Sequence, residues 1–110
     1  MAGNPIINIV GTQCQIQDEE KFNRWYNEIH VPMLMKDKRV LGVSRYKYFG
    51  KPGGLPNYIA IYKFGSLKDY QDHQISPEHD AAVKEMQATW KGSVELTSRI
   101  QYELVKEWTR

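Results

Sequence analysis

Hydrophobic and polar residues alternate with two different periods along the chain, and each period predicts one type of element. A period of two, with many β-branched residues, predicts strands over residues 6–16, 40–49, 58–64 and 94–108. A period near 3.6 predicts helices over residues 19–34 and 77–91, with a short helix over 66–73 before the second of these. The main elements therefore follow in the order strand, helix, strand, strand, helix, strand.

The first helix combines an apolar face with a proline near its end. One apolar arc contains Phe22, Trp25, Tyr26, Ile29 and Met33. His30 lies at the edge of this arc, four residues after Tyr26, so that the two side chains are neighbours on a regular helix. Pro32 offers no N–H to the carbonyl of Glu28, and its ring disfavours helical dihedrals at Val31. We expect the helix to kink or restart there, with His30 in its last regular turn.

Capping residues mark the helix boundaries. Three residues are placed to cap N-termini: Asp18, Ser66 and Ser76. Pro77 stands at the first helical position after Ser76, and Gly92 is placed to end that helix. Its buried stripe is predicted to consist of His79, Val83, Met86 and Trp90. The Gly53–Gly54 pair lies between two strands without a following helix, which indicates a turn and not a phosphate-binding loop.

The element order predicts an α+β protein with a ferredoxin-like βαββαβ fold. This fold has a four-stranded antiparallel sheet with two helices on one face. The strands nevertheless carry apolar residues on both faces, and in the last strand Val94, Leu96, Ile100, Tyr102, Leu104 and Trp108 are predicted on or near one face. One layer of helices cannot bury both faces. We therefore expect a symmetric homodimer in which two sheets pack face to face as a dimeric α+β barrel.

Composition narrows the possible functions. The chain has 110 residues, and we expect residues 1–110 to form one domain. A net charge of +2, from 15 basic and 13 acidic residues, does not indicate a nucleic-acid surface. No stretch has the length and apolarity of a membrane span, and Cys14 is the single cysteine, so we expect a cytoplasmic protein. The three histidines lack metal-ligand spacing, so neither a metal nor another cofactor is expected.

Two segments resemble a known superfamily. The stretch FNRWYNEIHVPMLMKDKRVLGVSRYKYF, with SPEHDAAV at the start of the second long helix, is similar to the dimeric α+β barrel superfamily and most closely to its EthD-like members. The specific parts are the W-Y-x-x-x-H-x-P segment and the S-P-E helix start. The superfamily includes cofactor-free ring-oxidising monooxygenases, polyketide cyclases, lactone isomerases, dehydratases and haem-degrading oxygenases. The resemblance therefore implies the fold but leaves the reaction open.

The predicted topology brings three polar residues to the same end of the space between sheet and helices. These are Asn8, His30 and His79, and they predict a small pocket there. His30 either bonds a backbone carbonyl freed by Pro32 or acts as a general acid or base. Its position beside the apolar arc predicts a pKa below about 6.5. Tyr26 either packs in the core or orients His30, and His79, whose pKa the helix N-terminus should lower, either is structural or bonds a substrate oxygen.

Further residues are predicted to shape this pocket. The expected substrate-binding residues are Asn8, Trp25, Met33, Tyr46 and Met86, and Trp25 is also compatible with plain core packing. Arg45 and Tyr46 lie on opposite faces of the second strand, so only one of them can face the helices. His73, between Asp72 and Gln74, is predicted to be solvated. Cys14 is predicted to be a small buried residue and not a nucleophile.

Three functions remain open on this basis. The first is a cofactor-independent enzyme for a small, largely apolar, oxygenated substrate, of the proton-transfer lyase, isomerase or cyclase type or of the ring monooxygenase type, with His30, Tyr26 and His79 as catalytic residues. The second is a non-catalytic small-molecule-binding or interaction dimer. The third is a haem-degrading monooxygenase: the resemblance places Asn8 and His79 where such enzymes have an asparagine and an axial histidine. These enzymes also carry a tryptophan on the third strand, which residues 58–64 lack.

Overall fold

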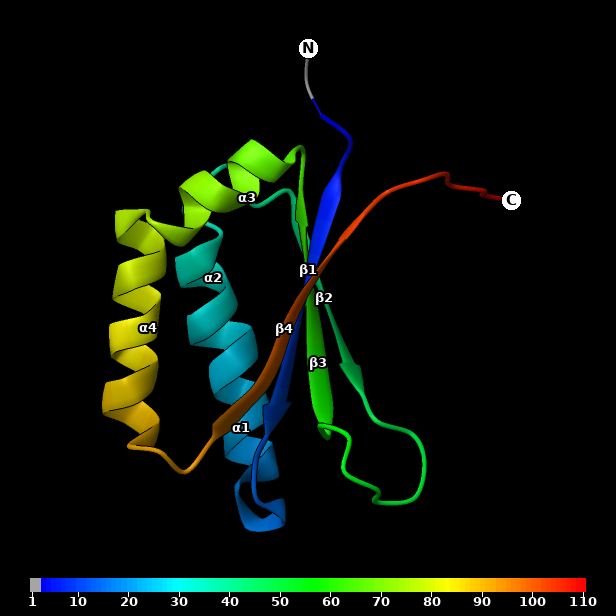
Figure 1. Ribbon diagram of the computed structural model, residues 1–110. Coiled ribbons are helices and arrows are strands. Elements are labelled where there is room, and N and C mark those ends of the chain that lie inside the picture. The colour runs from blue at the N-terminus through cyan, green and yellow to red at the C-terminus, as the bar shows by residue number, and fades with distance from the viewer. Residues whose placement is uncertain (1–2) are drawn as a thin grey trace.

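A computed structural model describes residues 3–110 and shows one antiparallel sheet covered by helices on one face only (Figure 1). The strands are β1 (Ile6–Gln13), β2 (Gly42–Lys47), β3 (Tyr58–Phe64) and β4 (Glu95–Glu103). The helices are α1 (Glu19–Trp25), α2 (Val31–Leu34), α3 (Leu67–Gln74) and α4 (Pro77–Trp90), with a 3-10 turn at Ile16–Asp18 and a π-helical segment at Tyr26–His30. No helix in this part of the chain has the length and apolarity that crossing a membrane requires.

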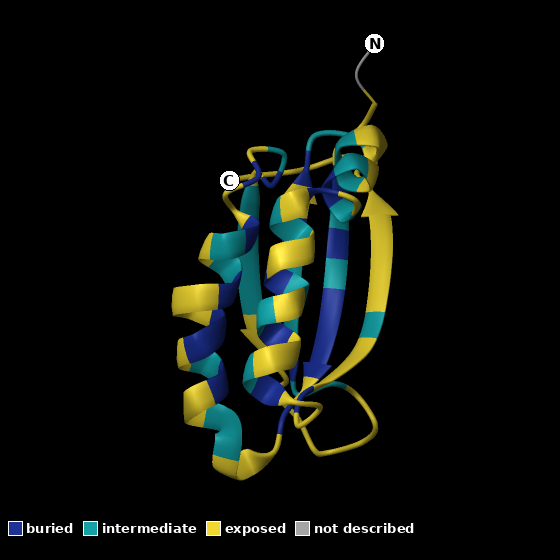
Figure 2. Cartoon of the chain, turned by 90° about the vertical axis from the view of Figure 1, so that its left-hand side faces the viewer, coloured by how far each residue is buried: buried dark blue, intermediate teal, exposed yellow. Residues whose placement is uncertain are grey.

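The strand order β2-β3-β1-β4, with antiparallel pairing throughout, confirms the predicted ferredoxin-like sheet. Seen from the helix side, exposed positions lie on the outward faces of the helices, and buried positions lie on their inner faces and in the central strands, whereas β4 is mostly exposed (Figure 2). The core between the two layers contains aromatic side chains of both: Phe22, Trp25, Tyr26, Tyr58, Tyr62, Phe64 and Trp90. Ser66 and Ser76 cap α3 and α4 as expected, because their hydroxyls accept bonds from the third residue beyond.

Other expected boundaries are wrong. β1 ends at Gln13 and the chain turns into the 3-10 segment, which leaves Ile16 at 86% exposed instead of in a strand. Asp18 occupies the N-cap position of α1, but within residues 3–110 its side chain accepts no capping hydrogen bond. α4 ends with left-handed dihedrals at both Lys91 and Gly92, so glycine terminates the helix together with the residue before it.

A bulge in β4 changes which of its residues face the helices. The register with β1 shifts between Gly11, paired with Ser98, and Thr12, paired with Leu96. A Cβ at position 11 would lie 2.6 Å from the Ser98 hydroxyl, so this approach requires glycine. Because of the extra residue, Leu96 and Ile100 do not share a face as expected. Ile100 pairs with Ile9 on the helix-free face.

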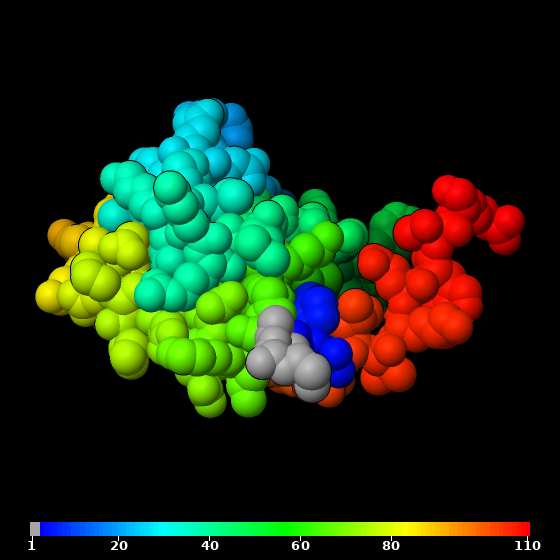
Figure 3. All heavy atoms as spheres, turned by 90° about the horizontal axis from the view of Figure 1, so that it is seen from above, coloured from blue at the N-terminus to red at the C-terminus, as the bar shows by residue number. Residues whose placement is uncertain are grey.

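The C-terminal residues also depart from the prediction. β4 ends at Glu103, so Leu104 and Trp108 do not continue the strand. The segment 104–110 extends away from the body of the chain, as the view from above shows (Figure 3). Trp108 is 78% exposed there.

Candidate functional site

The π-helical segment sets the direction of His30. The N–H of Val31 donates to the carbonyl of Tyr26, five residues back, while Val31 itself keeps helical dihedrals of −61° and −46°. α1 and α2 therefore form one continuous rod instead of the expected kink (Figure 1). The wide turn accommodates Pro32, which has no N–H to offer Glu28. Its extra residue rotates the following turn, so His30 is buried at 8% exposed while Ile29 is 43% exposed.

Pro32→Ala is expected to change this turn more than the stability of the fold. Alanine restores an N–H near the helix end, so a regular α-helix becomes possible and would turn His30 outward by roughly one residue, about 100°. The free energy of unfolding should change by less than about 1 kcal/mol, whereas the pKa of His30 should rise toward its ordinary value. NMR titration of the ring protons measures this. The control is Met35→Ala, one turn further and 44% exposed; an unchanged His30 pKa in Pro32→Ala would show that packing, and not proline, holds the turn.

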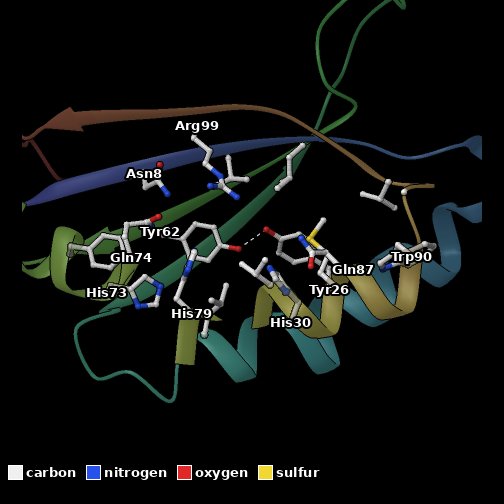
Figure 4. A pocket seen from close by; sticks show the side chains of 18 residues that line it. Asn8, Tyr26, His30, Tyr62, His73, Gln74, His79, Gln87, Trp90 and Arg99 are labelled. Carbon is white, nitrogen blue, oxygen red and sulfur yellow. Dashed lines mark hydrogen bonds between the residues drawn. The ribbon is translucent and has the colours of Figure 1, made fainter. Parts of the chain in front are cut away.

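A cavity of about 260 Å³ lies between the sheet and the helices (Figure 4). Its polar and aromatic lining residues are Asn8, Tyr26, His30, Tyr62, His73, Gln74, His79, Gln87, Trp90 and Arg99. Its apolar wall includes Val10, Leu34, Phe64, Val83, Met86, Val94 and Leu96. The structure thus brings Asn8, His30 and His79 to one cavity, as the topology predicted, together with Tyr26 and Met86.

His30 lies in the cavity wall, between the rings of Trp25 and Tyr26. Its ring stacks on Trp25, with centroids 4.7 Å apart, and meets the edge of Tyr26 at 4.9 Å. Its Nδ1 is buried and has no hydrogen-bond partner among residues 3–110. Burial lowers the pKa of His30 to about 4, and the positive charges of His79 and Arg45 act in the same direction, while Glu85 opposes them. The ring is therefore neutral at pH 7, as expected.

The hydroxyls of Tyr26 and Tyr62 form a hydrogen-bonded pair, 2.5 Å apart, at the centre of the cavity wall (Figure 4). Burial raises the pKa of Tyr26 and raises that of Tyr62 well above its usual value, so both phenols stay protonated. Arg45 lies over the ring of Tyr26 at 4.3 Å. Two hydroxyls offer two protons but use one between them, so the pair retains a donor for a ligand oxygen.

His79 and Asn8 reach the cavity from opposite layers. His79, the third residue of α4, is partly buried, and its pKa is lowered by burial first and then by the charges of His73 and Arg99. Asn8, on β1, is 5% exposed and accepts a hydrogen bond from Gln101 at 2.9 Å. The Asn8 oxygen is thus held in place by the sheet.

Three expected pocket residues lie outside the cavity. Tyr46 pairs with Ile59 on the helix-free face of the sheet and is 54% exposed. Its neighbour Arg45 is the residue that faces the helices, where it donates to Asn23. Trp25 lies in the core behind His30, where its Nε1 donates to Glu85 at 2.8 Å. Met33 packs against the core from outside the cavity wall, since the π-turn directs Leu34 inward instead.

The sequence reading missed a buried ionic group next to the cavity. His73 is 2% exposed and not solvated, and its Nδ1 lies 2.9 Å from Oδ2 of Asp37. Arg39 donates to the same carboxylate.

Two further cavity residues, Tyr62 and Arg99, were not predicted from the sequence. Residues 3–110 contain no group of three or more His, Cys, Asp or Glu side chains placed to share a metal ion. Cys14 is buried as predicted, and desolvation raises the pKa of its thiol.

Comparison with known proteins gives structural matches only. No protein-family model and no curated protein matches the sequence. An EthD-family protein from Bacillus halodurans matches with a TM-score of 0.70 at 15% identity, over 91% of this chain and 99% of that one. A dimeric protein of ferredoxin-like fold from Bacteroides fragilis matches with a TM-score of 0.68 at 18% identity, over 94% and 100%.

A third match is a protein from Bordetella bronchiseptica described as a candidate antibiotic biosynthesis monooxygenase, with a TM-score of 0.69 at 16% identity over 94% and 99% of the two chains. This chain shares their ferredoxin-like fold. The structural neighbours are thus EthD-family and dimeric ferredoxin-like proteins, in agreement with the resemblance read from the sequence. At these identities the likeness concerns the fold alone.

Proposed function

We propose that the chain is a cofactor-independent enzyme that transfers protons on a small, largely apolar, oxygenated substrate. The observation that carries this proposal is the His30 ring in the cavity wall, whose buried Nδ1 has no hydrogen-bond partner among residues 3–110. An unsatisfied buried polar atom costs roughly 1–3 kcal/mol, and a catalytic role is one reason for which a protein retains such an atom. The fold it shares with a candidate monooxygenase supports a small-molecule enzyme, without indicating the reaction.

The proposed chemistry begins with neutral His30. In the tautomer with its proton on the buried Nδ1, Nε2 accepts a proton from a phenol or from a carbon next to a carbonyl. Protonation is unfavourable in the empty cavity, but the anion formed on the substrate would stabilise the imidazolium beside it. Tyr26, paired with Tyr62, and His79 would hold the substrate oxygen. Trp25 fixes the plane of the histidine ring, and Met86 lines the apolar side.

The haem alternative does not fit the cavity. A volume of about 260 Å³ is at the small end for a ligand pocket, which suits a small substrate and not a group as large as haem. In addition, the His79 ring packs edge-on against His73 with centroids 5.3 Å apart. The alternative that remains is a non-catalytic binding dimer, which would use the same cavity without proton transfer.

Two small carbonyl compounds test the proposal. Acetophenone and α-angelica lactone are largely apolar and contain one carbonyl group. In each, a base can remove a proton from the carbon next to that carbonyl. Saturation-transfer NMR measures binding, and deuterium incorporation from D₂O at the carbon next to the carbonyl measures proton transfer. The proposal predicts exchange by the wild type and its loss in His30→Gln. Binding with no exchange above buffer would support the non-catalytic dimer instead.

We also propose that the helix-free face of the sheet is the contact between two copies of the chain. This face presents apolar residues from all four strands: Ile7, Ile9, Tyr46, Ile59, Ile61, Ile100 and Tyr102. Tyr46, Ile100 and Tyr102 are 54%, 46% and 55% exposed, which is a large apolar area for a face with no covering layer. The Bacteroides fragilis neighbour is described as dimeric.

The chain should accordingly elute with twice its own mass of 12.9 kDa in gel filtration coupled to light scattering at micromolar concentration. Ile100→Lys should produce the monomer, because it places a charge within the apolar face that forms the contact. Ile75→Lys, at a position 85% exposed at the end of α3, is the control and should remain dimeric. A monomeric wild type would contradict the sheet-to-sheet contact.

A further inference from the structure

The buried group formed by Asp37, Arg39 and His73 borders the cavity but has no part in the chemistry proposed so far. His73 comes from α3, and Asp37 and Arg39 come from the turn that follows α2. The side chains of His73 and Asp37 are only 3% and 4% exposed, and His73 Nδ1 lies 2.9 Å from Asp37 Oδ2. The ring of His73 is part of the cavity lining, between Phe64 and His79, each at a centroid distance of 5.3 Å.

The partners of Asp37 fix its charge. Oδ1 accepts from the backbone N–H and from Nη1 of Arg39, each at 3.1 Å, and Oδ2 accepts from Nη1 at 3.0 Å as well as facing His73. Burial raises the pKa of Asp37, but the hydrogen bonds from His73 and Arg39 outweigh it, and the pKa lies below its ordinary value. The carboxylate is therefore ionised at pH 7 and is neutralised by the Arg39 guanidinium, whose side chain is 41% exposed.

This arrangement fixes the tautomer of His73. An ionised carboxylate can only accept hydrogen bonds, so Nδ1 of a neutral His73 must carry the proton that faces Asp37. Nε2 then carries the lone pair, on the side of the ring away from Asp37. Carboxylate–histidine pairs orient catalytic imidazoles in the same way in unrelated enzymes.

We propose that His73 is a second catalytic base of this cavity, held in its reactive tautomer by Asp37 and Arg39 as positioning residues. The proposal rests on the proposed function for its substrate and narrows that substrate to a carbonyl compound that isomerises by moving a proton, such as an enolisable ketone or an unsaturated lactone. Arg99 and His79 line the same cavity and are placed to face the developing anion.

The step balances without any further reactant. A C–H bond next to the carbonyl breaks, its proton forms an N–H bond at Nε2, and its electron pair remains on the substrate as an enolate. The imidazolium keeps its Nδ1–H on Asp37, whose charge stabilises it. Nε2 then returns the proton to another carbon of the same anion. Substrate and product are isomers, and nothing is oxidised or reduced.

Long-range proton–nitrogen NMR correlation spectra test the tautomer without any substrate. His73→Asn assigns the signals, and the wild type should show protonated Nδ1 and unprotonated Nε2 at His73. In Asp37→Asn the amide oxygen should remain hydrogen-bonded to Arg39, so that the amide NH₂ faces His73. Nδ1 of His73 must then accept a hydrogen bond, and the proton should move to Nε2. Asp72→Asn is the control, because Asp72 pairs with Lys68 on the outer face of α3. Protonated Nε2 in the wild type would overturn the proposal, even if Asp37→Asn fails to fold.

Deuterium incorporation into acetophenone and α-angelica lactone separates this inference from the proposed function. Asp37→Asn should slow exchange by about 10²–10⁴-fold at nearly unchanged KM, whereas Asp72→Asn should exchange like the wild type. Loss of exchange in His30→Gln with full exchange in Asp37→Asn would reject His73 as a base and leave the proposed function intact. Full exchange in both variants would reject both.

Discussion

Trp90→Ala is expected to lower the free energy of unfolding by about 3–5 kcal/mol, as is usual when a large aromatic side chain is removed from a packed core. Trp90 is 5% exposed and packs edge-on against Phe22 and Trp25, at centroid distances of 5.9 and 5.7 Å. It joins the last turn of α4 to α1. Its Nε1 has no hydrogen-bond partner within residues 3–110, so the loss is one of packing and not of a hydrogen bond.

Guanidinium unfolding followed by circular dichroism at one fixed protein concentration measures this loss. Ile75→Ala is the control, since its side chain is 85% exposed at the end of α3 and should change stability by no more than about 0.5 kcal/mol. A loss below about 1 kcal/mol in Trp90→Ala would mean that α4 does not depend on this contact.

The fold could be predicted because its signals are local. β3 was predicted with the boundaries that the structure shows, because the run of β-branched and aromatic residues from Tyr58 to Phe64 is bounded by a glycine-rich loop and a capping serine. The predicted N-caps at Ser66 and Ser76 are confirmed for the same reason, because an N-cap depends only on the next three residues. The element order then left few topologies to choose from.

The predicted orientations of side chains are wrong wherever one extra residue enters a helix or a strand. The π-turn adds a residue to the first helix, which buries His30 and Leu34 and exposes Ile29. The bulge adds one to β4, which separates Leu96 from Ile100. A constant period of 3.6 or 2.0 cannot anticipate either insertion, although Pro32 and Gly11 mark where they occur.

The buried ionic group could not be predicted from local pattern at all. Asp37 and Arg39 lie in a charged run that is typical of a solvated turn, and His73 has polar neighbours on both sides. They become a buried cluster only because α3 folds over the end of α2, which joins residues 36 positions apart. Pairing at this separation is a property of the tertiary structure and leaves no periodic signal.

His30→Gln is expected to remove the acid sensitivity that His30 imposes on the fold. In the unfolded chain a histidine binds a proton as the pH falls below 6.5, whereas burial delays this in the folded state to about pH 4. Stability that is fully present above pH 6.5 is therefore lost as the pH falls through this window. The gap of about 2.5 pH units corresponds to roughly 3.5 kcal/mol at about 1.4 kcal/mol per unit, of which roughly 3 kcal/mol is lost by pH 4, where the folded histidine is half protonated.

Unfolding free energies of wild type and variant at pH 7 and pH 4 measure this effect. Glutamine is close in volume and still polar, so the two proteins should agree within about 1 kcal/mol at pH 7. At pH 4 the variant should be the more stable by roughly 3 kcal/mol beyond that difference. The comparison cancels the other titrating groups, including His79.

The same variant should lose proton transfer by about 10²–10⁴-fold, which is the usual contribution of a general base. The two results together decide the role of His30, because a buried structural histidine would show the pH effect without the loss of exchange. Equal pH dependence in wild type and variant would mean that the ring is solvated in the folded state. In that case Nδ1 would bond to water, and neither its missing partner nor its neutral charge would point to a substrate.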